Sequence, residues 1–224
     1  KDIEKECLKL SWSLIGKAEI NVICDKQKCI LSSSHNLAKI SKKFKYLIQD
    51  ENVAKFFLKV IGENPNISEM INSSYFFKTK ESKEIKLHQD NAYFNLNSGL
   101  DCLTFYIPVH PQSKNNGTIF YFKGSHKINL LDHVPEGNLG TSMCLKNDLS
   151  LKNLKNFEVE YLDLKPGDVV VHNALVVHGT LANPKGTKCE ALNFTLYSKS
   201  NLINKEKYSN YKKQLKNFLS KKNG

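Results

Sequence analysis

Arginine is absent from this 224-residue chain: its 33 basic residues are all lysines, and 22 acidic residues leave a formal net charge of +11. Proteins that read nucleic acids rely on the planar guanidinium of arginine, which binds a base or a phosphate through two hydrogen bonds. A chain with no such group would be an unusual nucleic-acid reader, so we expect no nucleic-acid partner. The charge is better suited to attracting an anionic small molecule, or a substrate on an acidic carrier protein.

The chain also lacks the patterns of membrane and disulfide-bonded proteins. No apolar run is long enough to cross a membrane, and no charged-then-apolar leader precedes the first residues. The six cysteines include no CxxC pair, which argues against a thiolate zinc site, and a chain of this size needs no disulfide framework. We expect a reduced, cytoplasmic protein without a membrane span, and no pattern indicates its oligomeric state.

Hydrophobic periodicity divides what we expect to be a single domain, residues 1–224, into three parts. Residues 1–72 are expected to be a largely helical support, with one helix over 37–48 capped by Asn36 and a second ending at Gly62. Residues 73–200 change to a period of two and predict a mainly β jelly-roll core. Residues 201–224 predict a basic C-terminal helix on the outside.

Short strands and turns fill the central part. Alternating apolar residues at 8–14 and 20–24 also leave room for one or two strands in the first part. The strands expected in the core are 74–78, 86–93, 102–109, 118–122, 157–162, 168–171 and 192–198. The long segment 132–148 is a candidate lid or a disordered loop.

One short motif indicates a metal site. His88 and Asp90 stand two residues apart in the strand expected over 86–93. Strand side chains alternate between two faces, so these two would point the same way. A histidine from a remote strand would complete two imidazoles and one carboxylate, the set that holds Fe(II) while leaving coordination positions open. A His-x-Asp triplet also arises by chance in a chain of this size, so the motif needs support from elsewhere.

That support comes from the motifs that follow the triplet in order. They are Tyr93-Phe94, Tyr106-Ile107-Pro108, Asn115-Asn116-Gly117-Thr118, Phe122-Lys123-Gly124-Ser125-His126-Lys127, Pro166-Gly167-Asp168, His172, His178-Gly179-Thr180 and Asn183. In this combination the chain resembles the phytanoyl-CoA dioxygenase family of Fe(II)- and 2-oxoglutarate-dependent oxygenases. The resemblance covers roughly residues 52–198.

The resemblance implies a double-stranded β-helix, which is a jelly roll of the cupin kind, with iron at one open end. By motif position, His88, Asp90 and His178 are the iron ligands. His172 is the rival for the last position, but the family places the metal histidine directly before a Gly-Ser/Thr pair, which favours His178. The carboxylate of Asp90 also separates this chain from related halogenases, in which a small residue stands at that position.

The co-substrate pocket departs from the family pattern. Family members hold the far carboxylate of 2-oxoglutarate with an arginine about eleven residues after the last histidine, and here that count falls on Cys189. A buried carboxylate still needs a cation. Lys188, next to Cys189, is the first candidate, and Lys78 and Lys86 are the alternatives.

Further residues are assigned to the pocket by their place in the motifs. Tyr106 is expected to donate a hydrogen bond to 2-oxoglutarate or to fill the core, and Thr180 is expected to border the same pocket and, with Asn183, to shape the loop after the last ligand. The residues expected to face the substrate are Gln89, Asn91, Tyr93, Tyr75 and Asn173.

The implied activity is that of a dioxygenase using Fe(II), 2-oxoglutarate and O2. It would hydroxylate a C–H bond of a small molecule, anionic or carrier-linked, and release succinate and CO2, with the protein supplying placement and exclusion of water. The missing arginine motivates an alternative, a catalytically inactive binding or regulatory protein on the same fold. A third interpretation, a ligand-binding jelly roll with a fortuitous triplet, is disfavoured by the ordered motifs.

Overall fold

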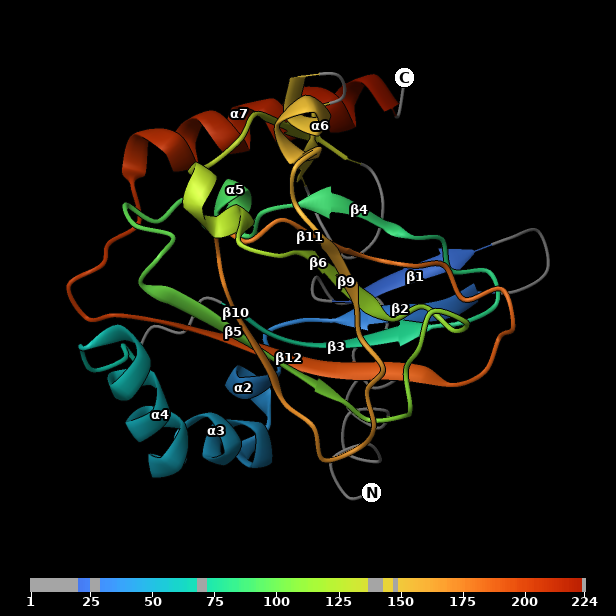
Figure 1. The fold of residues 1–224 in the computed structure, drawn as a ribbon, viewed down its shortest axis with the longest axis horizontal. Coiled ribbons are helices and arrows are strands. Elements are labelled where there is room, and N and C mark those ends of the chain that lie inside the picture. The colour runs from blue at the N-terminus through green and yellow to red at the C-terminus, as the bar shows by residue number, and fades with distance from the viewer. Residues whose placement is uncertain (1–19, 25–28, 68–71, 137–142, 147–148, 223–224) are drawn as a thin grey trace.

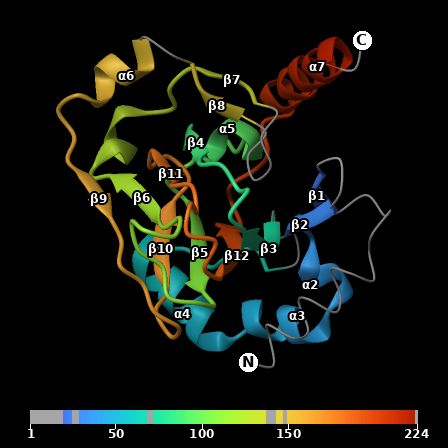
Figure 2. The same ribbon diagram turned by 90° about the vertical axis from the view of Figure 1, so that its right-hand side faces the viewer.

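The computed structural model describes residues 20–24, 29–67, 72–136, 143–146 and 149–222. Within them, two antiparallel sheets face each other and form a jelly roll (Figures 1 and 2). The major sheet has the order β1-β2-β3-β12-β5-β10, formed by Ile20–Cys24, Cys29–Ser34, Asn72–Lys78, Cys189–Tyr197, Cys102–Pro108 and Val170–Asn173. The minor sheet has the order β4-β11-β6-β9, formed by Ile85–His88, His178–Thr180, Ile119–Phe122 and Val159–Tyr161. The strand expected at 8–14 lies outside the described residues.

Strand β12 organises the major sheet because it pairs with β3 on one side and β5 on the other. Its side chains alternate between the two faces of the sheet. Leu192 and Phe194 are buried in one apolar cluster with the N-terminal helices, whereas Ala191 packs with side chains of the minor sheet. The major sheet therefore has one face toward the helices and one face toward the interior of the jelly roll.

Three short helices cover the outer face of the major sheet: α2 (Leu37–Ile40), α3 (Lys42–Ile48) and α4 (Glu51–Ile61). The expected end at Gly62 is confirmed, because this glycine has the left-handed φ of 85°. The continuous helix expected over 37–48 is wrong. Ser41 is extended and divides it, and Asn36 is left-handed and makes no side-chain cap.

The strand expected over 86–93 is also wrong in its second half. β4 ends at His88, and Asp90 begins the one-turn helix α5, Asn91–Phe94. The backbone N–H groups of Tyr93 and Phe94 both donate to the carbonyl of Asp90. His88 and Asp90 therefore do not share a strand face, and a turn at Gln89 brings them together instead.

The segment expected as a lid or a disordered loop contains ordered structure. It includes the hairpin of β7 (His133–Pro135) and β8 (Met143–Leu145), and helix α6 (Leu149–Leu154) follows it. Leu145 and Leu154 pack with Val177 in one apolar cluster. The described parts of this segment, together with α6, therefore cover the outer face of the minor sheet.

The C-terminal helix α7 spans Lys205–Lys222, close to the range expected. It lies on the opposite side of the molecule from α3 and α4 (Figures 1 and 2) and contacts α5 and β7. Among the described helices, none combines the length and apolar character needed to cross a bilayer.

Candidate metal centre

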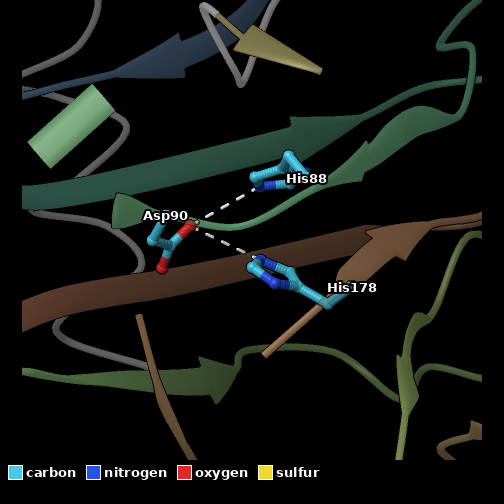
Figure 3. Close-up of side chains that lie close together, drawn as sticks. All are labelled: His88, Asp90 and His178. Atoms are coloured by element: carbon cyan, nitrogen blue, oxygen red, sulfur yellow. Dashed lines mark ion pairs between the residues drawn. The ribbon is translucent and has the colours of Figure 1, made fainter. Parts of the chain in front are cut away.

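Two histidines of the minor sheet face each other at the centre of the site. His88 ends β4 and is the direct cross-strand partner of His178, the first residue of β11, with 4.2 Å between their ring centroids. Asp90 folds back beside them from the turn into α5 (Figure 3). One ligand atom from each of the three buried residues lies within 4.8 Å of the others.

The two imidazoles are held in the tautomer that a metal requires. Nδ1 of His88 donates to the carbonyl of Lys86 at 2.8 Å, and Nδ1 of His178 donates to the carbonyl of Val176 at 3.0 Å. Because Nδ1 carries the proton, each Nε2 keeps its lone pair. These Nε2 atoms lie 3.5 and 3.6 Å from Oδ1 of Asp90. Two neutral imidazoles and one carboxylate fit Fe(II) in a site with open positions.

Asp90 is positioned by groups outside the three-residue set. Its Oδ1 accepts a hydrogen bond from the Tyr93 hydroxyl, and its Oδ2 accepts one from Thr104 Oγ1 at 3.0 Å. Burial raises the pKa of Asp90, but the nearby imidazoles of His178, His172 and His88 outweigh this effect and hold the pKa well below its ordinary value. Burial and the neighbouring His88 lower the pKa of His178. The carboxylate of Asp90 is therefore ionised at neutral pH, which suits a divalent cation.

His172 is a neighbour of this centre. Its Nε2 donates to Oδ2 of Asp90 at 3.3 Å, on the side away from Oδ1, and its Nδ1 accepts from the Tyr121 hydroxyl at 2.9 Å. Both ring nitrogens are thus engaged, Nε2 with Asp90 and Nδ1 with Tyr121. This geometry favours His178 over His172 as the ligand.

The glycine after His178 allows β11 to pair on both sides. A Cβ atom at Gly179 would lie 2.8 Å from the carbonyl oxygen of Ile85 and 3.1 Å from the ring of Phe120. A Cβ atom essentially never lies as close as 2.8 Å to another heavy atom, so a side chain here would push β11 away from β4 and press on the Phe120 ring of β6. The Gly of the His-Gly-Thr motif therefore keeps His178 opposite His88.

Gln89 was expected to face the substrate. Instead its side chain connects the turn between His88 and Asp90 to the loop that follows the 3-10 helix η1 (Ser125–Ile128). Its side-chain amide donates to the carbonyls of Asn129 and Leu175 at 2.8 and 2.6 Å and accepts from the N–H of Leu131 at 2.8 Å. Its backbone N–H donates to Nε2 of His133 at 3.0 Å. The side chain is fully buried, and its three hydrogen bonds all go to backbone atoms. The expectation for Gln89 is corrected.

The hydrogen bond between Gln89 and His133 is expected to make the stability of the fold sensitive to acid. Its Nδ1 donates to the Leu131 carbonyl, and burial lowers its pKa from 6.5 to about 4. Between pH 6.5 and pH 4, His133 is protonated in the unfolded chain but stays neutral in the folded protein. The free energy of unfolding therefore decreases as the pH is lowered, by up to about 1.4 kcal/mol per pH unit and by roughly 3 kcal/mol in all. Urea unfolding at pH 7 and pH 4.5 should show a smaller loss of stability for His133→Gln than for the wild type. Equal losses in both proteins would contradict this account.

Three more residues expected at the substrate lie elsewhere. Asn91 is buried and exchanges two hydrogen bonds with the backbone of Leu96, and Asn173 accepts from the N–H of Leu175 at 2.8 Å. Tyr75 is buried under the helices, on the other face of the major sheet, and donates to Glu190 at 2.6 Å. Only Tyr93, of the five residues expected to face the substrate, touches the metal ligands, through Asp90.

Among the lysines considered for the co-substrate, Lys78 is the one that enters the interior. Lys188 is exposed, and Lys86 forms an ion pair with Glu136 at 2.7 Å. Lys78 is the direct cross-strand partner of Cys189, the position where family members carry arginine. Its Nζ donates to the carbonyl of Leu181, and burial lowers its pKa to about 8. Of the three lysines, the structure therefore places Lys78 beside the position of the expected arginine, and it leaves Lys188 exposed.

The remaining expected pocket residues border Lys78 and the interior. Tyr106 lies between the sheets and donates to Gln112 Oε1 at 2.8 Å. Thr180 is buried and accepts from the N–H of Ile85 at 3.3 Å. The amide of Asn183 donates to the carbonyl of Lys78 at 2.9 Å and so fixes the loop after β11 to β3.

Thr104 and His133 were not predicted to act at the site, whereas His172 was considered there as the rival ligand. Thr104 could have been noticed, because it is a polar residue at an inward position of an otherwise apolar strand. No local pattern marks His133, whose contact with Gln89 joins residues 44 positions apart.

Two imidazoles and one carboxylate between the sheets of an antiparallel jelly roll are the arrangement found in non-heme iron oxygenases. Sequence comparison identifies the family to which the chain belongs. The model of the family "Phytanoyl-CoA dioxygenase (PhyH)" matches residues 17–185, so the chain belongs to this family.

Two curated relatives illustrate the range of the family. The chain is 27% identical over 150 residues to Phytanoyl-CoA dioxygenase 1 of Oryza sativa subsp. japonica, covering 66% of this chain and 50% of that protein. It is 27% identical over 134 residues to 1-deoxypentalenic acid 11-beta-hydroxylase of Streptomyces arenae, covering 58% of this chain and 47% of that protein. The chain spans about half the length of these curated relatives.

Solved structures confirm the predicted fold. EctD from S. alaskensis, solved with 2-oxoglutarate and 5-hydroxyectoine, aligns with a TM-score of 0.71 at 15% identity over 91% of this chain and 69% of that chain. The non-heme alpha ketoglutarate dependent carbocyclase SnoK from nogalamycin biosynthesis aligns with a TM-score of 0.68 at 16% identity over 91% of this chain and 78% of that chain. At this identity the likeness establishes the fold, a double-stranded β-helix.

Proposed function

We propose that this chain carries the active site of an Fe(II)- and 2-oxoglutarate-dependent dioxygenase that hydroxylates a C–H bond of a small molecule and releases succinate and CO2. The observation that carries the proposal is the convergence of His88, Asp90 and His178, all buried, in a chain of this family. The bound iron would supply the oxidation chemistry together with 2-oxoglutarate and O2.

Each residue of the centre has a distinct part in this proposal. The Nε2 atoms of His88 and His178 and Oδ1 of Asp90 would hold the metal. Hydrogen bonds from Tyr93, Thr104 and His172 keep the carboxylate from rotating, which fixes where the open coordination positions point.

Lys78 would bind the far carboxylate of 2-oxoglutarate. Cys189 replaces the arginine expected on β12, and the cation is supplied from the neighbouring strand at the same level of the sheet. In the absence of a ligand, burial lowers the pKa of Lys78. A carboxylate bound beside the amine would raise this pKa and so favour the charged form. Gly117 leaves room for the lysine stem, because a Cβ atom there would lie 2.8 Å from Cδ of Lys78.

An anionic or carrier-linked substrate is the class that the charge supports. α7, with the sequence KEKYSNYKKQLKNFLSKK, has seven lysines and one glutamate, and it contacts the helix that follows Asp90. A positive helix near the site would raise the local concentration of an anion.

Succinate release tests the proposed function. Purified protein with Fe(II), 2-oxoglutarate and O2 should form succinate, and a panel of anionic and carrier-linked substrates should raise the rate above the substrate-free background. The inactive binding protein considered as the alternative would bind Mn(II) and 2-oxoglutarate together without forming succinate. A protein that does neither would contradict both functions.

A further inference from the structure

The interior face of the major sheet carries polar side chains at positions that packing alone would fill with apolar ones. Under the metal centre, Thr195 of β12 is the cross-strand partner of Thr104, and their hydroxyls lie 3.0 Å apart. Thr104 in turn donates to Asp90. This row of the sheet therefore supports the carboxylate of the metal centre.

Further along β12, Cys189 pairs with Lys78, the cation proposed for the co-substrate. Asn193 lies between these two rows. Because strand side chains alternate, residues 189, 193 and 195 all lie on the interior face. A molecule that reaches from Lys78 to the metal would therefore pass over Asn193.

Asn193 is a polar side chain with unused hydrogen-bonding capacity. Within the described part of the chain its amide makes no hydrogen bond: Oδ1 is buried without a partner, and the N–H groups of Nδ2 are free to donate. Its cross-strand neighbours are Ser74 and Tyr106, and both hydroxyls are engaged elsewhere, with Asn72 Oδ1 at 2.6 Å and with Gln112 Oε1 at 2.8 Å. Buried polar groups are nearly always paired, so an unpaired one calls for a functional explanation.

We propose that Asn193 is a binding residue for the co-substrate, a role that rests on the proposed function and extends it. Carboxylate and keto oxygens only accept hydrogen bonds, so the amide group of Asn193 would donate its N–H to an oxygen of 2-oxoglutarate. The amide would fix the middle of the molecule while Lys78 and the metal hold its ends. Asn193 would thus help to align the 2-oxo acid for chelation.

The decisive experiment compares Asn193→Val with Asn173→Val. Asn173 lies on β10 opposite Leu103, on the helix-facing side of the same sheet, and its amide already accepts from Leu175. The dissociation constant of 2-oxoglutarate is measured by calorimetry with Mn(II) in the absence of O2, and thermal stability is measured without ligands. Asn193→Val should weaken 2-oxoglutarate binding by about 10-fold to 100-fold, typical of a lost hydrogen bond to a charged group. Its unliganded melting temperature should stay equal or rise, since an unpaired buried amide is replaced by a good strand former.

The control should behave in the opposite way. Asn173→Val should lower the melting temperature and leave 2-oxoglutarate binding unchanged. An Asn193→Val protein that melts earlier and binds 2-oxoglutarate as the wild type does would overturn the proposal, because Asn193 would then be structural. An unchanged dissociation constant with unchanged stability would overturn it too.

A second variant keeps the shape of the side chain. Asn193→Asp would place a negative charge against the co-substrate, and should weaken 2-oxoglutarate more than Asn193→Val does while Mn(II) binding persists. Equal 2-oxoglutarate binding by Asn193→Asp and the wild type would overturn the proposal. If the wild type itself binds no 2-oxoglutarate with Mn(II), the proposed function fails as a whole; wild-type binding with unchanged variants refutes the role of Asn193 alone.

Discussion

Replacing His178 by alanine is expected to abolish succinate formation and to weaken Mn(II) binding by at least ~100-fold. The variant removes one of three convergent ligands, whereas the loss of an outer hydrogen-bond partner of a metal ligand typically weakens binding by ~10–100-fold. His172→Ala removes such a partner, the donor to Oδ2 of Asp90, and should fall in that lower range. Calorimetry with Mn(II) and a succinate assay measure both effects.

His126 provides the control for this pair, since it lies in the η1 turn and takes no part in the convergent set. His126→Ala should bind Mn(II) as the wild type does. If His172→Ala lost the metal while His178→Ala retained it, the two histidines would have to exchange roles.

Lys78→Met should weaken 2-oxoglutarate binding by ~100-fold to 5000-fold, while Lys188→Met should leave it unchanged. Removing the partner of a buried charge costs about 3–5 kcal/mol, and Lys188 is exposed, where a charge contributes little. Calorimetry with Mn(II) in the absence of O2 measures both variants. If Lys188→Met weakened 2-oxoglutarate binding more than Lys78→Met did, Lys188 would be the residue that replaces the arginine.

The same lysine should make co-substrate binding depend on pH. Its pKa in the unliganded protein is lowered to about 8, so above that pH it loses the proton that a carboxylate requires. Each further pH unit should weaken 2-oxoglutarate binding by up to about tenfold. Lys188→Met should keep this dependence and Lys78→Met should lose it. A flat profile between pH 7 and 9.5 in the wild type would show that Lys78 does not bind the carboxylate.

The fold was predictable from the sequence because its strands alternate and its turns carry distinct residues. β3, β5, β6 and β12 lie close to where they were expected. The ordered motifs also named the three residues that converge, although the reason given for two of them was wrong: Asp90 reaches His88 through a turn and not along a strand. The short strands β7 and β8 follow no clear alternation and were missed.

The cation that we propose for the co-substrate could not be predicted from the sequence, because counting residues along one strand does not show which residue lies beside them on the neighbouring strand. Counting from His178 leads to Cys189 and suggests the adjacent Lys188, whereas the register of the sheet places Lys78 directly beside Cys189. Gln89 and Asn91 failed for a related reason. Residues next to metal ligands were expected to face the substrate, but the amide of Gln89 binds the backbone of Leu175, and the amide of Asn91 binds that of Leu96.

The central claim is that His88, Asp90 and His178 hold one metal ion. Anomalous diffraction from crystals grown with Mn(II) tests it most directly. We predict one strong peak between the two Nε2 atoms and Oδ1 of Asp90, with His172 outside the coordination sphere. A Mn(II) ion coordinated by His172 in place of His178 would contradict the account. The absence of a peak between these three residues in crystals soaked with millimolar Mn(II) would contradict it too.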